Sequence, residues 1–113
     1  MPDPLTPAHD LPIFDETHLD HQTMGDESLR VEILALFASE IERLLVQAER
    51  EEDSAKLAGR LHAIKGLARN VGARRLQQVV TGLEKDCQAG AADLAPLHEA
   101  VLEAIDYLKN APS

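Results

Sequence analysis

The stretch "RLHAIKGLARNVGARRL", residues 60–76, joins the end of one predicted helix to the start of the next. Before Gly72, apolar residues recur every three or four positions, which is the spacing of a helix with one buried face. These positions are Leu57, Leu61, Ile64, Ala68 and Val71. Gly72 is typical of the residue that ends a helix and reverses the chain. The stretch therefore predicts two antiparallel helices joined by a tight turn.

Three further helices follow from the same pattern. The two helices around Gly72 cover about 53–71 and 73–89. The further ones are two long helices, over about 26–51 and 93–108, and a short helix over 15–22. Capping residues or glycines mark their ends, as at Asp26, Asp53, Gly90 and Asp93. Aromatic residues make up only 3% of the 113 residues, so the core must consist of aliphatic side chains. We predict an all-α fold, an antiparallel up-down four-helix bundle with a short additional N-terminal helix.

Four prolines give residues 1–12 the composition of a flexible N-terminal tail, and residues 13–113 have the length of one domain. Cys87 is the only cysteine, which excludes an internal disulfide and fits a small core residue in a reducing compartment. The sequence shows neither a signal-peptide pattern nor an apolar run long enough for a membrane span. A cytoplasmic location is therefore expected.

The charge is negative overall and unevenly distributed. A net charge of −9 disfavours nucleic acid and anionic membranes as partners. Residues 54–83, however, carry six cations and no acid, so the rest of the chain has a net charge of −15. This basic segment suits contact with a phosphate or with a partner's acidic pocket, although an ordinary solvated surface has the same composition.

His62 lies about 140° from the apolar stripe on a helical wheel, and we expect its side chain to be exposed. Lys65, Gly66 and Arg69 follow at i+3, i+4 and i+7 on the same face, and Gly59 lies one turn before. A neutral imidazole is a nucleophile, and neighbouring cations disfavour its charged form and stabilise an attached phosphate. An exposed histidine is also a common surface residue, so the spacing alone leaves both interpretations open.

Equal helical rise on both sides of Gly72 brings His62 level with about Leu83 and Glu84. Glu84 would then accept a hydrogen bond from the imidazole nitrogen that does not react, or it would simply be solvated. The hairpin geometry does not decide between the two.

The other histidines give weaker signals. His18 and His21 are three residues apart, a spacing at which helical histidines can bind zinc. Because no third ligand accompanies them, we predict surface residues rather than a zinc site. His98 lies near the apolar stripe of the last helix and is predicted to pack at its boundary. No phosphate-binding glycine loop is present, so we expect no ATP site and no phosphorylation of the chain by itself from ATP.

The stretch "HAIKGLARNVGARRL" resembles the signature of histidine phosphotransfer (HPt) domains. That signature is a histidine, two variable residues, Lys or Arg, Gly, several small residues, an apolar residue, Gly, and a Leu on the next helix. The matching residues are His62, Lys65, Gly66, Val71, Gly72 and Leu76. The resemblance extends over almost the whole chain, but Leu67 and Arg69 occupy positions where the family usually has small residues.

The resemblance implies a role for each residue of the motif. His62 would carry the phosphoryl group on Nε2, Lys65 would help to hold the phosphate, and Gly66 would leave room for a partner. Glu84 would orient the imidazole, as a carboxylate does in the phosphotransfer domains of chemotaxis kinases. Arg69 would add contacts to the phosphate or the partner.

The resemblance also implies a function, that of a phosphorelay intermediate. His62 would accept a phosphoryl group from the receiver aspartate of a hybrid sensor kinase and donate it to a response regulator, or the reverse. The protein would be a monomeric carrier rather than an autonomous enzyme, without a cofactor or metal of its own, and Mg²⁺ would be bound by the receiver. The predicted docking surface consists of Ala58, Gly59, His62, Ala63, Gly66 and Arg69, with apolar help from the short first helix.

Two other functions remain open from sequence. In the dimerisation and phosphoacceptor domain of a histidine kinase, Glu usually follows the histidine and Pro comes shortly beyond, whereas here Ala63 follows and the helix continues. A helical binding module, in which His62 is inert, is the other alternative.

Overall fold

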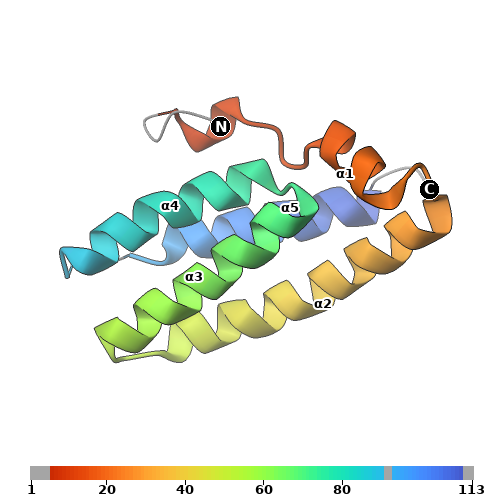
Figure 1. Cartoon of the computed structure of the whole chain (residues 1–113). Helices are drawn as coiled ribbons and strands as arrows, with labels where there is room; N and C mark the ends of the chain where they lie inside the picture. Colours follow the sequence, from red (N-terminus) through yellow and green to blue (C-terminus); the bar gives the residue numbers. More distant parts are fainter. Residues whose placement is uncertain (1–5, 91–92, 111–113) are drawn as a thin grey trace.

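A computed structural model describes residues 6–90 and 93–110 of the chain (Figure 1). The elements are a 3₁₀ helix η1 (Ala8–Asp10), α1 (Glu16–Thr23), α2 (Glu27–Arg50), α3 (Ser54–Val71), α4 (Arg74–Gln88) and α5 (Ala95–Asn110). Within these ranges all of the regular elements are helices, and none of the described helices is long and apolar enough to cross a membrane. The predicted all-α fold is confirmed.

The four long helices alternate in direction, and each packs beside its neighbour in sequence (Figure 1). The last helix, α5, also packs against α2, so the four long helices form a closed bundle. The short α1 lies at one end of the bundle, near the N-terminus of α2. This arrangement is the predicted up-down bundle with an additional N-terminal helix.

Local chemistry explains where α2 and α3 begin and where α3 ends. Asp26 and Asp53 cap the first turns, where each carboxylate accepts hydrogen bonds from backbone N–H groups that have no helical partner. Gly72 ends α3 with a φ of 75°, a left-handed conformation that a side chain disfavours. The turn into α4 is therefore fixed by a glycine, as the sequence predicted.

The core is built mainly from aliphatic residues of the four long helices. In α3 the predicted stripe is confirmed, since Leu61, Ile64, Ala68 and Val71 are all buried. In α2 the buried face contains Phe37, Ile41, Leu45 and Ala48, because that helix packs against both α3 and α5, whereas Leu36 is 66% exposed. Cys87 is buried, as expected for a small core residue.

The N-terminal segment predicted as a flexible tail, 1–12, lies outside the described residues as far as residue 5, and the part from residue 6 contacts α4. Arg75 donates hydrogen bonds from its guanidinium to the carbonyl oxygens of Leu11 (3.0 Å) and His9 (3.3 Å). Gln78 donates to the carbonyl of Thr6 at 2.9 Å. A proline-rich segment forms few internal hydrogen bonds, so its carbonyls are free to accept from these side chains.

Helix α1 is attached to the bundle through polar groups on both of its sides. Glu16 accepts hydrogen bonds from Arg30 of α2 and Tyr107 of α5. On the other side, His18 donates from Nε2 to the carbonyl oxygen of Asn70 at 2.9 Å, near the end of α3. These contacts hold α1 next to the C-terminal half of α3.

Candidate functional site

His62 is exposed on the outer side of α3, as predicted. Its neighbours in sequence explain the orientation, because Leu61 and Ile64 are fully buried and direct the opposite face of the helix into the core. Among the described residues, none forms a hydrogen bond with the His62 ring. Both ring nitrogens are therefore available to a reactant, and a neutral imidazole offers one of them as a nucleophile.

Lys65 lies one turn after His62 and faces α4. Its Nζ is 3.4 Å from Oε1 of Glu84, and both side chains are about three-quarters buried. Glu84 Oε1 is out of contact with solvent and accepts no hydrogen bond in the described part of the chain, so this cation is its electrostatic partner. One of the two cations near the imidazole is thus already paired with an anion.

Glu84 is therefore close to the predicted level on α4, but in this structure its contact is with Lys65 and not with His62. The difference arises from the helical rotation of the two residues. Lys65 is half-buried at the boundary between α3 and α4, whereas His62 points to solvent. The sequence argument did not determine which of these two side chains Glu84 contacts.

Two glycines leave open space on either side of His62. A Cβ placed on Gly59 or on Gly66 would have no atom of another residue within 4 Å, apart from its own chain neighbours and helix backbone. Glycine in the middle of a helix is less favourable than alanine by roughly 0.5–1 kcal/mol. Because packing within the chain requires no glycine here, the vacant surface is suited to the approach of another molecule.

Arg69 and Gly66 border a shallow hollow of about 630 Å³ between α3 and α1. The other lining residues are His18, His21, Gln22 and Asn70. The side chain of Gln22 donates to Asn70 Oδ1 at 3.4 Å, and this contact links the two helices across the hollow. Sequence analysis did not identify Gln22 as part of the site, because its place depends on how α1 packs.

The predicted site residues therefore gather on one side of the bundle. Gly59, His62, Ala63, Gly66 and Arg69 are exposed on α3, and Ala58 is half-buried. Lys65 and Glu84 lie at the edge of this surface, and the hollow beside α1 continues it.

The remaining histidines lie in other environments. His98 was predicted to pack at a helix boundary: its residue is exposed overall, and its Nδ1 is 2.9 Å from Oε2 of Glu49 on the neighbouring α2. The contact across this boundary is polar. In the described ranges, no cluster of three or more His, Cys, Asp or Glu residues could hold a metal ion.

The chain was also compared with known protein families, curated proteins and solved structures. The family model "Hpt domain" matches residues 32–111, which is 80 of the 113 residues and includes all of α3, α4 and α5. Comparisons with curated proteins and with solved structures gave no match. Hpt domains are phosphotransfer carriers of phosphorelays rather than catalytic enzymes, and they interact with receiver domains. With a matching bundle and an exposed histidine on α3, the chain belongs to the Hpt domain family.

Proposed function

We propose that His62 is the phosphoacceptor of this chain, which takes a phosphoryl group from a receiver aspartate and passes it to the aspartate of a response regulator. The observation that carries the proposal is the exposed His62 ring with an open glycine surface, at Gly59 and Gly66, one turn away on each side. Such a surface admits the active site of a second protein to the imidazole.

The transfer is a displacement at phosphorus. The lone pair of His62 Nε2 attacks the phosphorus of the aspartyl phosphate, a P–N bond forms, and the acyl P–O bond breaks. The departing electron pair stays on the receiver's carboxylate, and the ring holds the extra positive charge until the proton on Nδ1 is released. Donation to the next aspartate is the same step in reverse, with the carboxylate oxygen as nucleophile.

Lys65 and Arg69 supply positive charge near the phosphoryl group. Arg69 is exposed and forms no ion pair in the described part of the chain, so its guanidinium is free to bind phosphate oxygens or an acidic group of the partner. Lys65 is shared with Glu84. Glu84 therefore sets the position of Lys65, and its role as the orienting partner of the imidazole remains a prediction from the family resemblance.

The receiver domain would dock on Ala58, Gly59, Ala63 and Gly66 around the imidazole. The chain would act as a monomer, and Mg²⁺ would be bound by the receiver, so that the chain needs no cofactor or metal of its own. A single buried cysteine fits a reducing, cytoplasmic setting.

The test is to incubate the chain with a receiver domain that carries a radiolabelled aspartyl phosphate. The wild-type chain and His98→Gln, which removes another exposed histidine, should both gain an acid-labile, alkali-stable label. His62→Gln should gain none and should keep its helical circular dichroism. Label on His62→Gln, or on none of the three proteins with any receiver of a broad panel, would contradict the proposal.

A further inference from the structure

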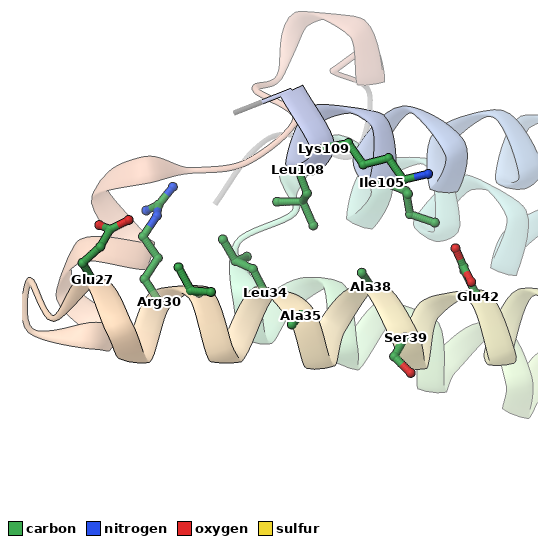
Figure 2. A pocket seen from close by; sticks show the side chains of 11 residues that line it. Glu27, Arg30, Leu34, Ala35, Ala38, Ser39, Glu42, Ile105, Leu108 and Lys109 are labelled. Atoms are coloured by element: carbon green, nitrogen blue, oxygen red, sulfur yellow. The ribbon is translucent and has the colours of Figure 1, made fainter. Parts of the chain in front are cut away.

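A second feature of the surface is an apolar groove between α2 and α5, of about 480 Å³ (Figure 2). Its floor consists of Leu34 and Ala38 of α2 with Ile105 and Leu108 of α5, and Figure 2 shows these side chains facing the space between the two helices. All of its lining residues belong to α2 and α5. The groove is thus separate from the surface of α3 that carries His62.

The groove has the shape and composition of a site for a helix. Val31 is 55% exposed at its edge, and Ala35 is exposed beside it. Small alanines along α2 let another backbone approach closely. A continuous apolar surface rimmed by polar residues is a common mark of a protein interaction site. An amphipathic helix binds such a groove with apolar residues spaced three or four positions apart.

The charges at the rim favour a basic partner. Glu27 and Glu42 of α2 line the groove, both are exposed, and neither pairs with a cation in the described part of the chain. Fifteen residues separate them, or about 22 Å of helix at 1.5 Å per residue. Arg30 is already matched by Glu16 at 2.6 Å, so among the described lining residues Lys109 is the one cation without an acidic partner.

We propose that this groove between α2 and α5 binds an amphipathic helix with basic flanking residues, about four turns long, from another protein. Leucine-like side chains of that helix would lie over Leu34, Ile105 and Leu108, and its lysines or arginines would pair with Glu27 and Glu42. The partner would be held on a surface that leaves His62 accessible, so docking and phosphotransfer are compatible.

Charge also argues against two other occupants. A second copy of this chain would bring two acidic molecules of net charge −9 together, with the same carboxylates on both sides of a two-fold interface. An anionic membrane surface would be repelled by Glu27 and Glu42 for the same reason. A basic helix is the occupant whose charge complements the rim.

The test uses the full-length chain and a fluorescein-labelled peptide of about 15 residues. The peptide consists of leucine and lysine with all leucines on one helical face. Fluorescence anisotropy should show that the wild-type chain binds it at least tenfold more tightly than an isomer with scattered leucines. Ala35→Lys, in the groove, should weaken binding at least tenfold. Leu36→Lys is the matched control, since it adds the same charge at an exposed residue of the same helix outside the groove, and it should change binding less than twofold.

Four results would overturn the proposal. These are no binding of the peptide, equal binding of the two isomers, equal weakening by Ala35→Lys and Leu36→Lys, or a dimer in sedimentation that Ala35→Lys dissociates, which would assign the groove to a second copy. Circular dichroism checks that both variants fold, and Val31→Lys is a second groove variant should Ala35→Lys fail that check. Failure here would leave phosphoryl transfer to His62 untouched, so the two proposals are tested separately.

Discussion

Lys65 Nζ lies 3.4 Å from Glu84 Oε1, so the cation one turn from His62 is bound to an anion of the neighbouring helix. A phosphoryl group on His62 would compete with Glu84 for this ammonium. The exchange of one anionic partner for another would require a rotation of the flexible lysine side chain. Under the proposed function, Glu84 would limit how strongly Lys65 binds the phosphate.

We predict that Glu84→Gln raises the fraction of His62 phosphorylated at equilibrium with a phosphorylated receiver, by about two- to fivefold. The reason is that a partly exposed ion pair contributes at most about 1 kcal/mol, and that interaction would become available to the phosphate. Radiolabel distribution at equilibrium measures the effect. Lys65→Met in the Glu84→Gln background should remove the gain. A fall in phosphorylation in Glu84→Gln would instead assign Glu84 to the imidazole, as the family resemblance implies.

Gly66→Arg should block phosphotransfer without unfolding the bundle. The surface above Gly66 is open, so an arginine side chain fits there in the unbound protein. Replacing a glycine inside a helix should also stabilise the folded protein by roughly 0.5–1 kcal/mol. The same side chain would stand where the receiver docks, and the transfer rate should fall at least tenfold, or about 1.4 kcal/mol.

Gly82→Arg provides the matched control for this prediction. Gly82 is an exposed glycine of α4 with equally open surroundings, on the side of that helix away from the core. The variant should transfer at the wild-type rate and should gain similar stability against urea. Equal slowing of transfer in the two variants would mean that the docking surface is not centred on Gly66.

Gly72→Ala should destabilise the protein more than Gly90→Ala. Both glycines have a φ near 75°, which is unfavourable for alanine by about 1–2 kcal/mol. A Cβ on Gly72 would also lie 3.0 Å from Cδ2 of His18, whereas Gly90 has open space. Urea unfolding should show an additional loss of about 1 kcal/mol for Gly72→Ala. That difference should become smaller when both substitutions are made in a His18→Ala background, which removes the ring but keeps the residue-18 Cβ at 3.3 Å.

Asp15→Ala should lower stability by about 1 kcal/mol at neutral pH, because Asp15 caps α1. A hydrogen bond from the backbone N–H of His18, and then the nearby Arg74 guanidinium, lower the pKa of the Asp15 carboxyl. A carboxyl group whose pKa is lower in the folded state than in the unfolded state stabilises the folded protein at pH values above the unfolded pKa. This stabilisation is lost as the pH falls through the pKa of the folded state.

The difference in unfolding free energy between wild type and Asp15→Ala should therefore be constant above about pH 5 and should shrink once the pH falls below the ordinary aspartate value of about 3.9. Urea unfolding at a series of pH values measures it. Asp20→Ala, at an exposed carboxylate of the same helix, is the control and should change stability by less than about 0.5 kcal/mol at any of these pH values. A difference in unfolding free energy between wild type and Asp15→Ala that increases at low pH would contradict this prediction.

The helices and the outward position of His62 were predictable because they depend on local chemistry. Asp26 and Asp53 act on backbone groups within three residues of themselves, and Gly72 acts through its own φ. His62 is exposed because Leu61 and Ile64 must be buried. Such relations within one helix are contained in a short stretch of sequence.

Relations between distant segments could not be predicted in the same way. Arg75 reaches the carbonyl of Leu11 over 64 positions, and no periodic pattern encodes that contact. Glu84 was expected level with His62, but the contact it makes is with Lys65, and that choice depends on how α3 and α4 are rotated against each other. His98 was placed at a boundary from its own helix alone, and its contact with Glu49 required the packing of α5 on α2.

Two parts of the chain line the hollow beside Gly66. Arg69 and Asn70 lie within residues 32–111, which match the family, whereas His18, His21 and Gln22 precede that range. Substitutions confined to α1 would change the rim of this hollow and leave the histidine-bearing helix unaltered. Under the proposed function, partner choice and phosphoryl chemistry would then depend on different segments of the chain.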